Sequence, residues 1–206
     1  MIVLFGIIAY LLGSIPTALL IGKWFFKIDI RDYGSNNPGA TNTFRVLGKK
    51  AAVVVLLIDV GKGAAAALIP TLFAVEADPL YMGLIAVIGH CFPIFAGFRG
   101  GKAIATTAGA LLVANAWMFL TAYIAFFLTI AITKYVFFGS LSVGISLFIY
   151  SIMERNVDHS IIFALFSLFL LFLHRTNICN FIDKKEPKIN DKNLRNDRID
   201  SLAKKQ

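Results

Sequence analysis

The sequence is poor in charged residues, in cysteine and in histidine. Charged residues make up 16% of its 206 positions, against about 25% in a soluble domain. The two cysteines, Cys91 and Cys179, fit no zinc-ligand spacing and cannot build a disulfide framework. We therefore interpret both as small apolar fillers, and predict no metal and no cofactor.

Apolar residues take the place of the missing charges. They make up 58% of the chain, and the mean hydropathy is +0.75. Several apolar stretches reach the roughly 20 residues that cross about 30 Å of hydrocarbon. The stretches are 1–22, 51–75, 80–98, 103–133, 135–152 and 160–173. The first has no basic segment before it, so we interpret it as a retained span and not as a signal peptide.

The charged residues predict the orientation of the chain. The loop after the first span contains six Lys or Arg, and such loops stay in the cytoplasm. We therefore place the N-terminus outside. A single helix over 103–133 would be about 45 Å long, so we predict a break at Asn115 and two shorter helices, 103–113 and 117–133. The prediction is an all-α polytopic membrane protein with about seven transmembrane helices and a cytoplasmic C-terminus.

Two regions are expected from this reading. Residues 1–183 form the membrane-embedded domain, and residues 184–206 form a basic, disordered cytoplasmic tail. The tail suits the surface of an anionic membrane. It has no aromatic residues interleaved for base stacking, so we predict no nucleic-acid partner.

A first polar cluster covers residues 32–45, with glycine, serine and amide side chains and a single Arg45 on a short helix expected after Pro38. Glycine lets backbone N–H groups approach a phosphate, and arginine can bind one through two hydrogen bonds. An ordinary turn followed by a capped helix explains the same composition, and the residues alone leave both open.

A second cluster, residues 89–102, ends in Gly100-Gly101-Lys102. This too suits a phosphate, or a glycine-rich turn with a cytoplasmic lysine. It is not a Walker A loop, because Ala96 and Ala103 stand where that motif needs glycine and Ser or Thr.

A third cluster, residues 174–178, lies at the predicted cytoplasmic end of the last span and is followed by Glu186. It could orient a substrate or simply end a helix at the interface. Asp59 and Lys62 share one face of a predicted helix, which indicates an internal ion pair or, alternatively, a proton relay.

The three clusters together resemble the bacterial acyl-phosphate:glycerol-3-phosphate acyltransferase family (PlsY family). Its first motif reads approximately S-G-N-x-G-A-T-N-x-x-R, and residues 35–45 here read SNNPGATNTFR. The second motif is present as GHCFP at 89–93 and FRGGK at 98–102, and the third as HRTNI at 174–178 with Glu186. The start, Gly13 to Pro16, and Gly139-Ser140 also match. This chain departs from the family pattern at Asn36, Phe137, Asn180 and Lys184.

The resemblance implies transfer of a fatty acyl group from acyl phosphate to the 1-hydroxyl of glycerol 3-phosphate. The products are lysophosphatidic acid and phosphate, the reaction serves phospholipid biosynthesis, and the site faces the cytoplasm at the cell membrane. The implied catalytic residues are Ser35, Arg45, Lys102, His174 and Asn177. The implied substrate-binding residues are Asn37, Gly39, Ala40, Thr41, Asn42, His90, Gly100, Gly101 and Ser140.

Two alternatives remain at this point. One is a membrane transporter of a phosphorylated solute, which would explain the spans and the basic loops but not the three motifs. The other is an inactive family member. The sequence lacks the His-x4-Asp pattern of acyltransferases that use thioester donors, because Phe95, Ala164 and Cys179 stand five residues after its three histidines.

Overall fold

A computed structural model describes residues 1–191, 194 and 197–199, and every regular element in this part of the chain is a helix. This confirms the all-helical prediction. Two short 3-10 turns, η1 (Ile30–Asp32) and η2 (Ile94–Ala96), lie in the loops of the first two clusters. The α-helices are α1 Ile2–Gly13, α2 Thr17–Phe26, α3 Ala40–Val46, α4 Lys49–Leu72, α5 Pro79–Cys91, α6 Ile104–Ala114, α7 Ala116–Thr133, α8 Val136–Met153, α9 Val157–Leu173 and α10 Arg175–Ile182.

The helix lengths fit a protein that crosses the membrane several times. Five helical segments are long and apolar enough to span a bilayer, and α9 with α10, bent by 55°, adds a sixth. Each of the seven predicted ranges contains a helix. However, α6 has 11 residues and is only about 16 Å long, short of the hydrocarbon thickness.

The predicted break at Asn115 is confirmed. Asn115 is extended and separates α6 from α7, and its side-chain oxygen accepts hydrogen bonds from the N–H groups of Trp117 (2.9 Å) and Met118 (3.1 Å). An asparagine at this position satisfies N–H groups that have no partner inside the helix.

The first span contains a break that the prediction of one continuous segment missed. Helix α1 ends at Gly13 and α2 begins at Thr17, with Pro16 between them. Because proline has no N–H group and disfavours a helical residue before it, the backbone leaves the helix here. The Ile15 carbonyl accepts a hydrogen bond from a buried lysine on α4 instead.

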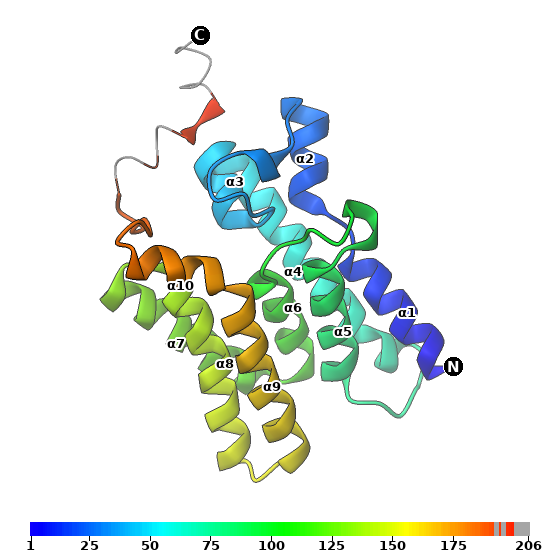
Figure 1. Ribbon diagram of the computed structural model, residues 1–206. Coiled ribbons are helices and arrows are strands. Elements are labelled where there is room, and N and C mark those ends of the chain that lie inside the picture. The colour runs from blue at the N-terminus through cyan, green and yellow to red at the C-terminus, as the bar shows by residue number, and fades with distance from the viewer. Residues whose placement is uncertain (192–193, 195–196, 200–206) are drawn as a thin grey trace. The chain divides into compact units, whose positions relative to one another are not determined.

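The chain forms two compact units, and each is described by itself. The first comprises residues 1–114 and the described residues after 193, and the second comprises residues 115–192. In the first unit α4 lies against α5 and α6, and α1 against α5 (Figure 1). A Cβ on Gly63 would lie 2.0 Å from the Thr106 carbonyl, and one on Gly109 would lie 1.8 Å from the Val60 carbonyl. Glycine therefore allows the close approach of α4 and α6, as small residues do in membrane helix pairs.

The second unit packs α8 against α7 and α9. Phe181 of α10 lies in an aromatic cluster with Tyr135, Phe137 and Phe138, at ring-centroid distances of 5.0–5.7 Å. Beyond α10, the Ile189 N–H donates to the Lys134 carbonyl (2.8 Å). The boundary predicted at 183/184 stays a prediction, and tail residues 192–193, 195–196 and 200–206 lie outside the described residues.

Candidate active site

The loop of the first cluster is organised around Asn42, which is 2% exposed. Its side-chain oxygen accepts from the Ser35 N–H (2.9 Å), and its amide donates to the carbonyls of Tyr33 (3.0 Å) and Ile30 (3.3 Å). One buried amide thus fixes the backbone on both sides of Gly34 and presents Ser35 at the surface. Asn42 therefore shapes the backbone of the loop, a role that the motif alone did not indicate.

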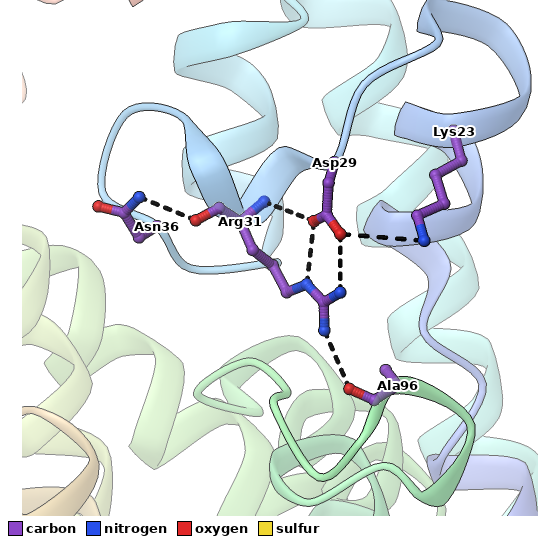
Figure 2. Close-up of polar contacts among 5 residues, drawn as sticks. All are labelled: Lys23, Asp29, Arg31, Asn36 and Ala96. Atoms are coloured by element: carbon purple, nitrogen blue, oxygen red, sulfur yellow. Dashed lines mark hydrogen bonds and ion pairs between the residues drawn. The ribbon is translucent and has the colours of Figure 1, made fainter.

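A second polar contact connects this loop to the loop of the second cluster. The Arg31 guanidinium donates to both carboxylate oxygens of Asp29 (2.9 and 2.7 Å) and to the Ala96 carbonyl in η2 (2.9 Å), as Figure 2 shows. We call this arrangement the Arg31 clamp. Both side chains are mostly buried, with 15% and 21% exposure. The clamp therefore holds the two loops together within the first unit.

The clamp also changes the acid–base properties of its members. The side-chain hydrogen bonds from Arg31 hold the pKa of Asp29 below its ordinary value, and Asp29 in turn raises the pKa of Arg31. Lys23 lies 3.9 Å from the same carboxylate, but its side chain is 53% exposed and contributes little (Figure 2).

Helix α3 begins after Gly39 and carries Arg45, which confirms the expected short helix. The Gly39 N–H donates to the Asn37 carbonyl (2.9 Å), and the Thr43 hydroxyl donates to the Gly39 carbonyl (3.0 Å). Arg45 forms an ion pair with Asp197, close to the end of the described chain. A phosphate bound by Arg45 would compete with this carboxylate.

The glycines of the second cluster are required by packing. A Cβ on Gly100 would lie 2.0 Å from the His90 carbonyl, and one on Gly101 would lie 2.3 Å from His90 Nε2. Their N–H groups donate to the carbonyls of Cys91 and His90, both at 3.2 Å. These N–H groups are thus used inside the loop, and the glycines fit it closely over the His90 ring.

The two loops share one small hollow in the first unit. Pro38 comes from the first loop and His90, Gly100 and Gly101 from the second, while Lys62 of α4 reaches it from below. Lys102 follows directly and is half-buried. Of the implied site residues, His90, Gly100 and Gly101 line this hollow, and the first loop contributes Pro38, between the implied Asn37 and Gly39.

The other implied residues, Ser140, His174 and Asn177, belong to the second unit. The Asn177 amide donates to Glu186 Oε1 (2.6 Å), and His174 Nδ1 lies 2.9 Å from the Leu170 carbonyl. The Ser140 hydroxyl donates to the Val136 carbonyl (3.2 Å). Glu186, which follows the third motif, thus fixes the orientation of the motif's asparagine.

Comparisons with known proteins identify the family of the chain. Residues 3–184 match the family model described as glycerol-3-phosphate acyltransferase. The chain belongs to the glycerol-3-phosphate acyltransferase family. It is 49% identical to a glycerol-3-phosphate acyltransferase of Exiguobacterium sibiricum, with 89% of this chain and 91% of that one covered. It is 46% identical to the Bacillus subtilis glycerol-3-phosphate acyltransferase, with 92% and 98% covered.

Solved structures of this acyltransferase family show the same fold. The chain is 31% identical to PlsY (YgiH), an integral membrane glycerol 3-phosphate acyltransferase, in its glycerol 3-phosphate form, with a TM-score of 0.82. The alignment covers 90% of this chain and 94% of that one. The lysophosphatidic acid form gives a TM-score of 0.78 at 30% identity over the same shares. This chain is therefore a multi-pass membrane protein of that fold.

Two departures from the acyltransferase motifs fall on left-handed backbone. Asn36 (φ 57°) and Lys184 (φ 58°) both stand where the motif has glycine. Asparagine tolerates this conformation, and the Asn36 amide also donates to the Arg31 carbonyl (2.8 Å, Figure 2). Lys184 closes α10, where its N–H and that of Lys185 donate to the carbonyls of Phe181 and Asn180 in a Schellman motif. Both residues therefore adopt a backbone conformation that glycine reaches without strain.

Proposed function

We propose that this protein transfers a fatty acyl group from acyl phosphate to the 1-hydroxyl of glycerol 3-phosphate, releasing lysophosphatidic acid and phosphate. Membership of the acyltransferase family supports the acceptor and the reaction class. The observation that carries the proposal is the joining of the two motif loops by the Arg31 clamp, with Arg45 on α3 directly after the first loop and Lys102 at the end of the second. Two cations beside neighbouring loops suit two substrates that both carry phosphate.

Acyl phosphate is the donor that fits this chemistry. It is an activated mixed anhydride, so the reaction needs no metal and no covalent acyl-enzyme. The 1-hydroxyl oxygen attacks the acyl carbon, the bond between that carbon and the phosphate oxygen breaks, and the hydroxyl proton passes to the departing phosphate. Arg45 and Lys102 offset the repulsion between the two anionic substrates and the charge of the leaving phosphate.

Ser35 has an orienting role in this proposal. It lies exposed on a loop that Asn42 holds rigidly, so its hydroxyl can donate a hydrogen bond to a phosphate from a fixed position. A covalent role would need a base to remove its proton. In the sequence, the histidine nearest to Ser35 is His90, 55 residues away (90 − 35). For His174 and Asn177 we propose orienting roles on the strength of the family motif alone.

The donor is tested with purified protein in lipid nanodiscs, labelled glycerol 3-phosphate and a panel of acyl phosphate, acyl-CoA and acyl carrier protein thioesters. We expect lysophosphatidic acid only with acyl phosphate, and no acyl group on Ser35 by mass spectrometry of the intact protein. Product from a thioester would contradict the proposed donor. Uptake of glycerol 3-phosphate into vesicles without acylation would instead identify a transporter.

We also propose that the site faces the cytoplasm at the cell membrane, with the N-terminus outside. The basic loops support this orientation. A membrane-impermeant thiol reagent should label a Lys134→Cys variant from the cytoplasmic side, in a background in which Cys179 is replaced by serine. Labelling only from the outer side would contradict the orientation.

A further inference from the structure

A buried group of charges lies directly beneath the second motif loop. Asp59 is 1% exposed, Lys62 6% and His90 7%. Asp59 Oδ1 lies 2.9 Å from Lys62 Nζ and 3.6 Å from His90 Nδ1, and accepts a hydrogen bond from the Thr17 hydroxyl (3.0 Å). Elements α2, α4 and α5 therefore meet at one carboxylate.

Lys62 has a second partner in the same place. Its ammonium donates to the Ile15 carbonyl (2.9 Å), which the break between α1 and α2 exposes. The ammonium lies between this carbonyl and Asp59, and its side chain also lines the hollow below the glycine loop. A charge buried this deeply is costly unless it is paired, so Asp59 and Lys62 depend on each other.

His90 connects this charge pair to the loop. One side of its ring, Nδ1, faces Asp59, and the other side, Nε2, lies against Gly101, where a Cβ would approach to 2.3 Å. Nδ1 has no hydrogen-bond partner among the residues that the structure describes, because 3.6 Å is too long for a hydrogen bond. The backbone carbonyl of His90 also accepts from the Gly101 N–H. The ring and backbone of His90 are therefore both in direct contact with the glycine loop.

We propose that Asp59, held by Lys62, is a positioning residue that orients the His90 ring and thereby fixes the Gly100–Gly101 loop for the phosphate of glycerol 3-phosphate. This inference rests on the proposed function of the loop. The carboxylate attracts Nδ1–H, which leaves Nε2 directed toward the loop and the hollow. The pair acts through His90 and does not contact the reacting atoms.

The competing explanation is that the pair only stabilises the packing of α2, α4 and α5, and a double substitution separates the two. Asp59→Leu with Lys62→Met replaces the pair by apolar side chains of similar size, which is often neutral or stabilising for buried ion pairs. We expect a thermal midpoint close to that of the parent. We also expect KM for glycerol 3-phosphate at least ~10-fold higher and KM for the acyl donor within about twofold, since a small misplacement of a binding group costs up to about 100-fold. An unchanged KM for glycerol 3-phosphate in a stable double variant would overturn the proposal.

Thr17→Val is the matched control. It removes a hydrogen bond to the same carboxylate oxygen and leaves Asp59, Lys62 and His90 themselves unchanged. We expect both KM values to stay within about twofold of the parent, because the approach of Asp59 to His90 is kept. A rise in KM for glycerol 3-phosphate as large as that of the double variant would show a packing effect and overturn the proposal.

A spectroscopic measurement decides the matter if the double variant does not fold. The chain has three histidines, so nitrogen-15 labelling of histidine gives signals that a His90→Gln variant can assign. In the parent we expect Nδ1 to carry the proton, and the Nε2 signal to shift on titration with glycerol 3-phosphate. A signal that does not respond would overturn the inference. This titration needs no turnover, so it is read independently of whether lysophosphatidic acid is formed.

Discussion

The Arg31 clamp gives a quantitative prediction for Arg31→Met. The substitution removes one charge-assisted hydrogen bond to the Ala96 carbonyl and two to Asp29. The bond to the carbonyl is worth about 1.5–3 kcal/mol. The pair with Asp29 is local, two residues apart, and partly exposed, so we assign it about 1 kcal/mol or less. The contact between the two loops should therefore weaken by about 2–3 kcal/mol.

Hydrogen exchange with mass spectrometry measures this weakening directly. The N–H groups of Gly100 and Gly101 are protected by bonds inside the second loop. At about 1.4 kcal/mol per factor of ten, their exchange should become roughly 30–100-fold faster in the variant. Activity, measured as kcat/KM, should fall by at least ~10-fold, with the exchange of α4 unchanged. Equal exchange of the loop in Arg31→Met and the parent would refute the reasoning.

Lys23→Met is the control for this experiment. Lys23 Nζ lies 3.9 Å from the same Asp29 carboxylate, and the lysine side chain is half-exposed. We expect Lys23→Met to weaken the contact between the two loops by less than about 0.5 kcal/mol, with no measurable change in the hydrogen exchange of the second loop.

Three further predictions follow from individual contacts. Lys184→Gly should raise the thermal midpoint by about 2–4 °C, because a left-handed lysine costs about 1 kcal/mol that glycine does not. Asp197→Asn should lower KM for the acyl donor by about two- to fivefold at unchanged kcat, because a partly exposed ion pair with Arg45, worth up to about 1 kcal/mol, no longer competes with phosphate. The pKa of Asp29 is lowered in the folded protein, so the stabilising effect of this carboxylate is present above about pH 4 and is lost as the pH falls further. Asp29→Asn should therefore reduce the acid sensitivity of the contact between the two loops, as measured by hydrogen exchange.

Each of these has a result that would contradict it, and the first also has a control. Lys185→Gly, one residue on and not left-handed, should not raise the midpoint, and an equal gain there would contradict the backbone argument. A higher KM for the acyl donor in the Asp197 variant would show that the carboxylate assists binding. Equal acid sensitivity of the Asp29 variant and the parent would show that other carboxyl groups control the loop.

The all-helical fold could be predicted because hydrophobic length and the distribution of charge are properties of the chain itself. The break at Asn115 followed from the excess length of 103–133 and from the capping ability of asparagine. The break at Pro16 was missed, although Gly13 and Pro16 were visible, because the run stays apolar through both. Only the three-dimensional arrangement shows that Lys62 takes up the exposed Ile15 carbonyl.

The candidate site was predictable as motifs but not as contacts. The contact of Arg31 with Asp29 was not predicted, because an acid two residues before an arginine in a basic loop is common. The contact of Arg31 with Ala96 spans 65 residues of sequence, and no local sequence pattern predicts it. The expectation that Gly100 and Gly101 bind phosphate stays a prediction. The structure shows in addition that their N–H groups bond within the loop and that their lack of a Cβ allows the close packing on His90. Asp59 and Lys62 were expected to pair, and they do. The approach of Asp59 to His90 could not be predicted, because helix periodicity relates only residues of the same helix.

The central claim is that acyl phosphate and glycerol 3-phosphate react at the two basic loops. The stoichiometry of the reaction catalysed by the purified protein tests this claim most directly. With acyl phosphate and glycerol 3-phosphate, we expect one phosphate released for each lysophosphatidic acid formed, and kcat/KM lowered by at least ~100-fold in both Arg45→Ala and Lys102→Ala. Phosphate release without lysophosphatidic acid, or full activity in both variants, would contradict the account.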